Sequence, residues 1–446
     1  MSVTRRILVG LLLCAATFAP SPHVLPALSR GHTSGARPVL PAHPLGASIR
    51  IGRRSRGGRP VLPLHAVPPV VLRTIALRTN PYDIAINQRL GLVYVTSVTG
   101  GVTGLDAATG MVRYTLPPLL RADVIEPDTP PLVAVDEVAG LLYVSNSRNG
   151  APAIIGVFDA RTGALRRRLA AGLGAVALAL DARAGRLYVM SIGQGGRVHT
   201  FDTRSGAFVR ALYVPVSNNG ASVAVDARRG RAYIGTDEGV SVVDARTGTG
   251  IRPIPTDDFE NHTLAVDDRS GSLVVAGWGA RGSDLSIIDA RNRHVLHATD
   301  TGDVPDAVAV DAVTRRIFAS SSDTVGDTVG RTTLHVLDVD TGAVVHTGTH
   351  VGADAVVQTI DPQTGRVYLT GDPPGTPEGG AGPPGPGQVT VLDGRDGAVL
   401  RRLTVGPSPS SVALDGRTRR AFVVNQGAWD PYGKVLVPGS VTVIAT

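Results

Sequence analysis

The sequence has almost no cysteine: the one cysteine among 446 residues, Cys14, lies in an apolar run near the N-terminus. A single cysteine allows no disulfide within the chain, no CxxC redox pair and no CxxCH haem attachment. The HExxH, GxSxG and P-loop motifs are also absent, as is a GxGxxG in a strand–helix context. We therefore predict no catalytic residues, and a non-catalytic role is favoured over an enzymatic one.

Acidic residues are missing from the first 69 positions, which hold nine arginines. Taking these nine from the 44 basic residues leaves 35 against 37 acidic residues, a net charge of −2 for the rest of the chain. The formal charge of +7 therefore belongs to the N-terminal segment. Nucleic-acid binding by the remainder gets no support from its charge, and no nucleic-acid partner is expected.

The N-terminal segment has the features of a secretory signal peptide over residues 1–19. Arg5 and Arg6 precede a thirteen-residue apolar run, Ile7–Ala19, which is too short for a comfortable membrane span. We expect a secreted or cell-surface protein with no transmembrane segment after cleavage, and Cys14 leaves a lipoprotein anchor as the alternative. Residues 20–69, rich in Pro, Gly and Arg, are predicted to be a disordered linker. The linker is either a plain spacer or a segment that attracts anionic surface polymer or lipid headgroups.

The sequence is rich in one repeat. A pattern of apolar residue, Ala, apolar residue, Asp recurs at intervals of 41 to 54 residues, close to the period of propeller blades. Each copy is followed by three more short β-rich runs, for example "LYVSN" (142–146), "IGVFD" (155–159) and "ALRRRLA" (164–170). Four strands per unit describe a blade. Clear copies of the pattern end at Asp136, Asp181, Asp226, Asp267, Asp311 and Asp415, and weaker copies end at Asn87 and Asp361.

The eighth unit has a third run, "SVTVIAT" (440–446), but no fourth. Residues 70–78, "VVLRTIALR", resemble the other fourth strands, and we predict that they complete this blade and close the ring. Closure would remove the open sheet edges of the blade. We therefore predict an all-β fold over residues 70–446: a β-propeller of eight four-stranded blades, with seven blades as the alternative.

The second strands "VYVTS" and "LYVSN", the G-R-x-Y turn before several others and the V-x-V-x-D-x-x-T-G third strand resemble the YVTN family of β-propeller repeats. The resemblance covers about residues 70–446 and is carried by architectural residues. It implies the propeller fold, which this family uses in secreted bacterial propellers and in surface-layer-like proteins, and it implies no particular activity. The chain departs from the family in having eight units where seven are usual.

Short turns of the form Asp-x-x-x-Gly join the first strand to the second and the third to the fourth, as in "DARTG" (159–163). Asp accepts backbone N–H bonds and Gly adopts the left-handed conformation, so these turns are structural. All of them fall on one face of the ring, the tight-turn face. The opposite, variable face carries connections of unequal length. Because loops on a rigid scaffold often hold function, we expect any binding site on the variable face, over the central channel.

Two groups of residues on the variable face are candidates for ligand binding. The starts of the first strands should line the channel mouth, and they contain Tyr82, Asp83, Asp306 and Asp354. An aromatic ring beside polar groups suits ligand stacking or a protein contact, and the loop 425–440 supplies Asn425, Trp429, Asp430 and Tyr432. Structural alternatives stay open: separate solvated carboxylates in the first group, and a tryptophan packed on a neighbouring blade in the second.

No metal site or cofactor is predicted. Asp257, Asp258 and Glu260 are weak candidates for Ca²⁺ ligands, but they lack EF-hand spacing, and a solvated acidic loop is the alternative. No pattern supports a quinone. We predict a secreted, monomeric, non-catalytic propeller that binds a protein or cell-surface ligand. The alternatives are an extracytoplasmic propeller enzyme, either a lactonase-like hydrolase or a quinone-cofactor oxidoreductase, and a surface-layer-like structural protein.

Overall fold

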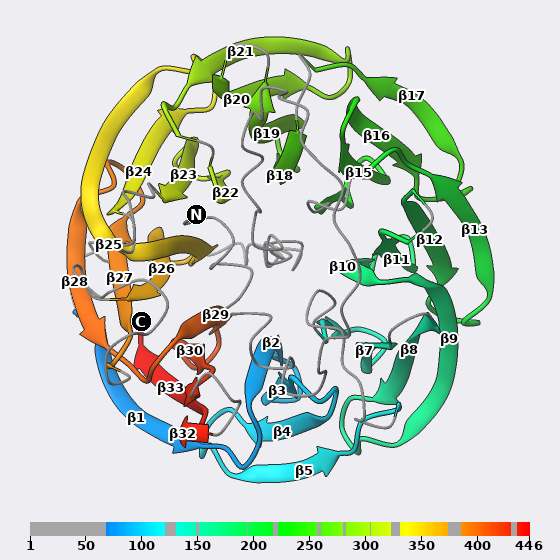
Figure 1. Cartoon of the computed structure of the whole chain (residues 1–446), viewed down its shortest axis with the longest axis vertical. Helices are drawn as coiled ribbons and strands as arrows, with labels where there is room; N and C mark the ends of the chain where they lie inside the picture. The colour runs from blue at the N-terminus through cyan, green and yellow to red at the C-terminus, as the bar shows by residue number, and fades with distance from the viewer. Residues whose placement is uncertain are drawn as a thin grey trace, which may run out of the picture.

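The computed structural model describes residues 68–446 except 121–130, 149–150, 194, 217–221, 257–259, 280–281, 304, 323–330, 373–384 and 430–434. The predicted signal peptide and nearly all of the predicted linker lie outside the described residues. Strands and turns make up the described part of the chain, without a helix. Eight four-stranded antiparallel blades form a ring (Figure 1). The predicted eight-bladed β-propeller is therefore confirmed over the alternative of seven blades.

In blades 1 to 5 the strands follow chain order, and the first strand is nearest the centre of the ring (Figure 1). Blade 1 contains β2 (Pro81–Asn87), β3 (Leu92–Ser97), β4 (Val102–Asp106) and β5 (Val112–Leu116); blade 2 contains β6 (Val133–Asp136), β7 (Leu141–Arg148), β8 (Ala151–Asp159) and β9 (Leu165–Leu173). Blade 3 contains β10 (Ala175–Asp181), β11 (Arg186–Ser191), β12 (Arg197–Asp202) and β13 (Phe208–Tyr213); blade 4 contains β14 (Val223–Asp226), β15 (Arg231–Thr236), β16 (Gly239–Asp244) and β17 (Gly250–Ile254). Blade 5 contains β18 (Glu260–Asp267), β19 (Ser272–Gly279), β20 (Gly282–Asp289) and β21 (His294–Asp300).

Blades 6 and 7 share one long strand, β25 (Val344–Ile360), and so form a single seven-stranded sheet. The beginning of β25 pairs with β24 as the outer strand of blade 6, and its end pairs with β26 as the inner strand of blade 7. In blades 1 to 5, by contrast, the outer strand of one blade and the inner strand of the next are separate strands. The remaining strands of these blades are β22 (Ala307–Asp311), β23 (Arg316–Ser322), β24 (Arg331–Asp338), β26 (Arg366–Asp372), β27 (Gln388–Asp393) and β28 (Val399–Thr404).

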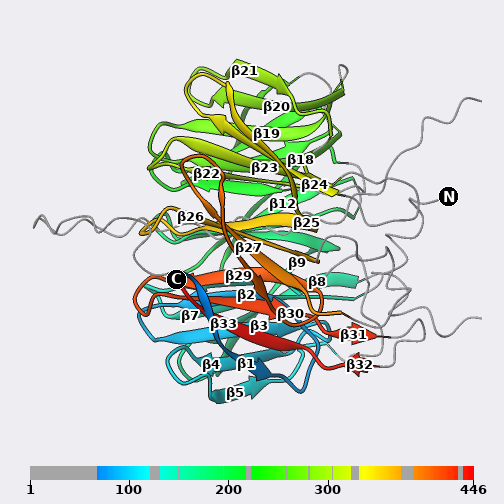
Figure 2. The ribbon, with the colours of Figure 1, turned by 90° about the vertical axis from the view of Figure 1, so that its left-hand side faces the viewer.

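Blade 8 joins the two ends of the propeller. It contains β29 (Pro409–Asp415), β30 (Arg420–Asn425), β33 (Ser440–Ala445) and, as its outer strand, β1 (Val70–Ala76). The pairing of β1 with β33 is antiparallel and runs from Val70 opposite Ala445 to Ala76 opposite Ser440. The predicted closure by residues 70–78 is therefore confirmed. Between β30 and β33 the chain forms a separate two-stranded sheet, β31 (Ala428–Trp429) and β32 (Val435–Val437), which lies on the variable face (Figure 2).

The hydrophobic core lies between neighbouring blades because the side chains of a strand alternate between its two faces. In β3, Val93 and Val95 pack with Phe422 of blade 8, whereas Tyr94 packs with Leu142 of blade 2. Each second strand therefore serves two interfaces. This explains why the second strands are buried over almost their whole length.

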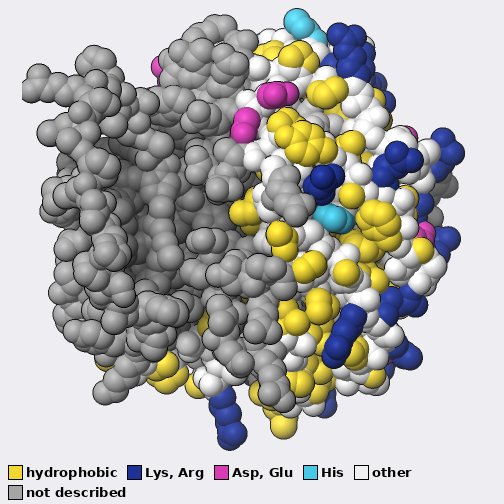
Figure 3. Space-filling model, turned by 45° about the vertical axis from the view of Figure 1, so that its right-hand side comes forward, with side chains coloured by type: hydrophobic (Ala, Val, Ile, Leu, Met, Phe, Trp, Pro, Cys, Tyr) yellow, Lys and Arg dark blue, Asp and Glu magenta, His cyan; other side chains and the backbone are white. Residues whose placement is uncertain are grey.

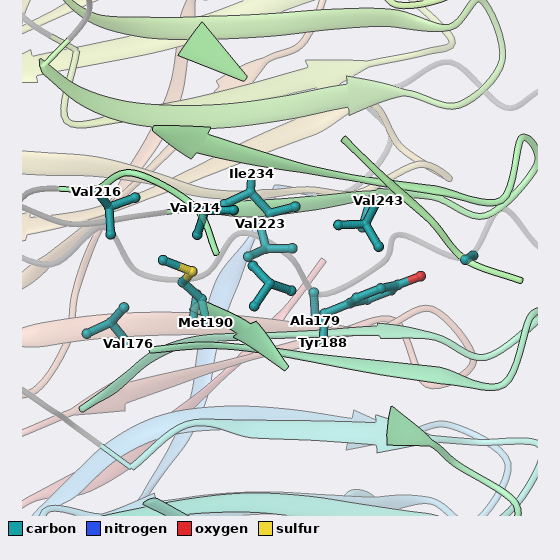
Figure 4. Packing of buried hydrophobic residues seen from close by; sticks show 13 residues of the cluster. Val176, Ala179, Tyr188, Met190, Val214, Val216, Val223, Ile234 and Val243 are labelled. Carbon is teal, nitrogen blue, oxygen red and sulfur yellow. The ribbon is translucent and has the colours of Figure 1, made fainter. Parts of the chain in front are cut away.

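The interface of blades 3 and 4 shows this packing in detail (Figure 4). Met190 and Tyr188 of β11 lie toward Val223 and Ile234 of blade 4, and all four are at most 4% exposed. Burying one such side chain stabilises the fold by about 1.5–3 kcal/mol. Small β-branched residues fill most of this space, in agreement with the low aromatic content.

The outer strands form the rim of the ring. Figure 3 shows hydrophobic side chains on the described part of the rim, with positively charged side chains beside them. Phe208 and Tyr213 of β13 are exposed, and so is Arg210 on the same strand. A charged side chain on an edge strand discourages pairing with another chain, so these arginines protect the open edges of the blades.

Candidate functional site

In the Asp-x-x-x-Gly turns, the aspartate side chain accepts hydrogen bonds from backbone N–H groups of the same turn. In the turn at 159–163, Oδ1 of Asp159 accepts the N–H groups of Arg161 at 3.1 Å and Thr162 at 2.9 Å, and Arg166 donates to Oδ2 at 2.7 Å. The bond from Arg166 is the main cause that lowers the pKa of Asp159 to about 2. Gly163 ends the turn with a φ of 74°. The carboxylate of Asp159 thus serves the turn itself, as the sequence pattern predicted.

The residues that define the repeat hold neighbouring blades together. The hydroxyl of Tyr94 in β3 donates to the carbonyl of Ala160 in blade 2 at 2.8 Å. The hydroxyl of Thr96 donates to the carbonyl of Pro131, at the start of blade 2, at 2.9 Å. Tyr94 and Thr96 are two residues apart, so they face the same side of the strand. One strand therefore contacts the next blade at both of its ends.

The arginine that begins a second strand, which is the Arg of G-R-x-Y in blade 3, makes a further contact between blades. Arg186 of blade 3 donates to the carbonyl of Arg246 in blade 4 at 3.1 Å, and Arg420 of blade 8 donates to the carbonyl of Ala107 in blade 1 at 2.7 Å. These bonds occur on the tight-turn face. The repeat residues are architectural, and a ligand site has to be built from other residues.

Asp83 is the predicted site residue that the structure characterises best. It is 7% exposed, near the start of β2. Its Oδ1 accepts the N–H of Ile84 at 2.8 Å and the hydroxyl of Ser411 at 3.3 Å, and its Oδ2 accepts the N–H of Val133 at 3.0 Å. The carboxyl group therefore joins blades 8, 1 and 2. Burial raises the pKa of Asp83 to about 6 in spite of these three bonds.

The other candidates at the channel mouth belong to different blades. Tyr82 is half-buried, and its carbonyl accepts the hydroxyl of Ser410 at 3.1 Å, while burial raises the pKa of its phenol. Asp306 is half-buried just before β22, and its N–H donates to the carbonyl of Ser320 at 2.8 Å. Asp354 lies within β25. The structure brings Tyr82 and Asp83 together with the start of β29. A ligand-binding role for all four stays a prediction.

Asn425, at the end of β30, is fully buried. Its Nδ2 donates to the hydroxyls of Ser440 at 3.0 Å and Thr442 at 2.9 Å, so the side chain ties β30 to β33. Trp429 lies in β31, opposite Val435 of β32. Asp430 and Tyr432 of the same predicted group fall outside the described residues. Binding by this loop is therefore still a prediction.

The weak metal candidates are mostly outside the described residues. Asp257 and Asp258 lie outside the described residues. Glu260 is described and begins β18, opposite Trp278 of β19. Within the part of the chain that the structure describes, no three His, Cys, Asp or Glu side chains lie close enough to hold a metal ion. The Ca²⁺ hypothesis was weak in the sequence, and nothing in the described residues adds to it.

Sequence reasoning missed Ser411 as the partner of Asp83. A signal was present, because Pro409 at the start of β29 corresponds to Pro81 at the start of β2, which places Ser411 in register with Asp83. The register alone does not show contact between blades 8 and 1. That contact depends on closure of the ring.

Comparisons with known proteins agree with the fold. No protein-family model matches the chain. The chain is 26% identical over 282 residues to the uncharacterized protein YncE of Salmonella typhi, and to that of Salmonella typhimurium strain LT2, over 60% of this chain and 77% of each relative. The chain is a β-propeller similar in sequence to YncE.

Two solved structures share its shape. The computationally designed Ika8 protein has a TM-score of 0.59 at 13% identity and covers 84% of this chain and 99% of its own. BamB from Moraxella catarrhalis has a TM-score of 0.55 at 16% identity and covers 85% of this chain and 100% of its own. At such identities the likeness shows the fold alone. That a designed protein is among them underlines how little the ring by itself says about activity.

The described residues contain no helix of the length and apolar character that a membrane span requires.

Proposed function

We propose that this YncE-like chain is an extracytoplasmic, non-catalytic propeller of the YVTN-repeat type, which binds a protein or a cell-surface ligand through its variable face. The N-terminal signal-like segment and the repeat pattern support this proposal. The chain acts as a monomeric scaffold, and the ligand contacts come from connections that differ between blades.

The observation that carries the proposal is the difference between the two faces of the ring. On the tight-turn face the hairpins of the described residues share one short form: Asp, or Asn in one turn, begins the turn, and a residue with positive φ ends it, which is Gly in most turns and Arg in three. On the variable face, β15 and β16 are joined by residues 237–238, whereas β26 and β27 are joined by residues 373–387. A ring of equal blades needs no such difference, so loops of unequal length indicate a specific contact.

A binding experiment with cell envelopes tests the proposal. The full chain, carrying a fluorescent label, is added to envelope fractions of the organism that encodes it. A variant in which a short Gly-Ser turn replaces residues 373–384 should bind at least about tenfold more weakly, a loss of about 1.4 kcal/mol. Arg204→Ala changes an exposed side chain of the tight-turn face and should bind like the wild type.

Two outcomes would count against the proposal. Equal losses in the loop variant and in Arg204→Ala would remove the special role of the variable face. Concentration-dependent assembly of the purified chain into sheets would favour the surface-layer-like alternative, because a monomeric scaffold should sediment as a single species.

An enzyme remains the second candidate, because a carboxyl group with a pKa near 6 suits general base catalysis. The alternative would use Asp83 as that base in a lactonase-like or quinone-dependent reaction. Its oxygens already accept three hydrogen bonds, which argues for a structural role. Turnover of lactones, or of alcohols with a quinone, that is lost in Asp83→Asn while the melting temperature is kept would establish the enzyme.

A further inference from the structure

A cavity of about 310 Å³ opens on the tight-turn face between blades 1 and 2. Turns from three hairpins form it: the β2–β3 turn, the β6–β7 turn and the β8–β9 turn. This face is opposite to the one proposed above for the main ligand, so the two sites are independent. The side chains that matter in its wall are Arg89, Leu90, Glu137, Val138, Asp159 and Arg161.

The two arginines of this wall are not used to hold blades together. Neither the Arg89 nor the Arg161 guanidinium has a hydrogen bond or ion pair within the described part of the chain. A turn arginine can instead join two blades, as Arg228 of blade 4 does by donating to Asp268 of blade 5 at 3.0 Å. The guanidiniums at the cavity are therefore available to an anion from solution.

The two carboxylates of the wall are already bound. Asp159 accepts hydrogen bonds from Arg166 and from the backbone of its own turn. Its lowered pKa keeps the carboxyl group ionised in the ion pair with Arg166. Glu137 accepts the N–H of Gln88 at 3.2 Å. The wall itself holds two guanidiniums and two carboxylates, and because both carboxylates already have partners, the guanidiniums are the groups left to bind an anion.

One side of the cavity is apolar. Val138 is 65% exposed. Val138 stands two residues after the aspartate of its turn. The β10–β11 and β14–β15 turns have Arg183 and Arg228 at this position, so a solvated charge is usual there. Together with Leu90, Val138 gives the cavity an apolar wall beside its cationic one.

The β8–β9 turn that carries Arg161 is held in place. The hydroxyls of Tyr94 in β3 and Tyr114 in β5 both donate to the carbonyl of Ala160, each at 2.8 Å. A fixed backbone lowers the entropy that a bound ligand would have to remove. The cavity is therefore present before a ligand arrives.

We propose that this cavity binds an aliphatic carboxylate. Arg89 and Arg161 hold the carboxylate, because guanidinium groups form paired, charge-assisted hydrogen bonds with it. Leu90 and Val138 contact the apolar body of the ligand. The volume, at the lower end for ligand sites, suits a group about as large as one amino-acid residue. Such a group is either a small free acid or the C-terminal residue of a peptide.

Isothermal titration calorimetry of the full chain with N-acetyl-L-leucine tests this proposal. We expect a Kd of about 1 mM, the affinity of a small ligand with one charged anchor. N-acetyl-L-leucinamide lacks the carboxylate and should bind at least about tenfold more weakly. A pentapeptide that ends in leucine with a free carboxylate separates the two sources: tighter binding than the free acid indicates a peptide terminus, and equal binding indicates a small acid.

Matched variants assign the binding to this cavity. Arg161→Gln should raise the Kd for N-acetyl-L-leucine at least about tenfold. Arg204→Gln changes the corresponding arginine of the β12–β13 turn in blade 3 and should leave the Kd unchanged, while unaltered melting temperatures show that both variants fold. Absence of binding up to about 10 mM, equal binding of the amide or of inorganic phosphate, or equal losses in both variants would overturn the proposal.

Discussion

Asp181 and Asp226 end the first strands of blades 3 and 4, and both are fully buried. In each, Oδ1 accepts two backbone N–H groups of the turn that follows. They differ at the second oxygen. Oδ2 of Asp226 accepts Arg229 at 2.8 Å, whereas Oδ2 of Asp181 has no partner among the described residues. Burial accordingly raises the pKa of Asp181.

The difference comes from one position, three residues after the aspartate. Blade 4 has Arg229 there and blade 3 has Ala184. Other blades use a hydroxyl: Thr364 and Thr418 each donate to the corresponding Oδ2 at 2.7 Å. The aspartate and glycine thus determine the backbone of the turn, and a separate residue compensates the buried charge. Blade 3 keeps the Asp and Gly that determine the turn, but it lacks a residue that compensates the buried charge of Asp181.

Removal of the compensated aspartate should have the largest effect. Asp226→Ala leaves two partly buried N–H groups without an acceptor and Arg229 without its carboxylate. We expect the free energy of unfolding to fall by about 2–4 kcal/mol. Urea denaturation, followed by circular dichroism, measures this loss. A smaller loss for Asp226→Ala than for Asp181→Ala would contradict the comparison.

Asp159 offers the same turn near the surface. Asp159→Ala should lower the free energy of unfolding by about 1 kcal/mol, as for loss of a local capping residue. Binding through the variable face should be unchanged, because the turn lies on the opposite face. Denaturation and the envelope-binding assay test both statements, and a loss of binding larger than the loss of stability would show a functional role for Asp159.

Supplying the missing partner in blade 3 should stabilise the protein. Ala184→Thr places a hydroxyl where Thr364 and Thr418 stand in their blades, so that it donates to Oδ2 of Asp181. We expect a gain of about 0.5–1 kcal/mol in the free energy of unfolding. Arg183→Thr adds the same side chain at the neighbouring exposed position and is the matched control. A gain from the control as large as that from Ala184→Thr would show that this bond is not the cause.

The smallest effect is a difference in pH dependence. Because the folded state raises the pKa of Asp181, the folded protein binds this proton more tightly than the unfolded chain. Ionisation above about pH 4 therefore lowers the stability of the wild type, and Asp181→Asn, which cannot ionise, escapes this decline. The stability of Asp181→Asn relative to the wild type should therefore rise as the pH increases above about 4. Asp159 has a lowered pKa, so its stabilisation should instead be lost as the pH falls from about 4 to about 2.

Sequence patterns predicted the features that repeat. Eight copies of the first-strand pattern, seven ending in Asp and one in Asn87, gave the number of blades, and the missing fourth strand of the last unit led to residues 70–78 as its completion. The long strand β25 was not predictable, because its second half pairs with a blade other than its first half. The period-2 pattern does not say which sheet a strand belongs to.

The site was predicted less well than the fold, for a physical reason. Asp83 was identified, but its bonds to Ser411 and Val133 exist because three blades meet there. Asn425 was predicted to bind a ligand at the start of the loop 425–440; the structure buries it at the end of β30, where it binds Ser440 of β33, and its role in binding stays a prediction. The cavity beside Arg161 went unnoticed because its turns are far apart in the sequence.

Closure of blade 8 also has a consequence for synthesis in the cell. The ribosome releases β1 well before β33, and at about 5–20 residues per second the delay between them is roughly 20 to 70 s. During this time β1 has no partner strand, and Val70, Val71 and Leu72 of a nascent chain are exposed to other apolar segments. Seven blades can assemble while translation continues, but the ring waits for its final strand. Chaperones that cover β1 during this delay would thus have more influence on the yield of folded protein than on its final stability.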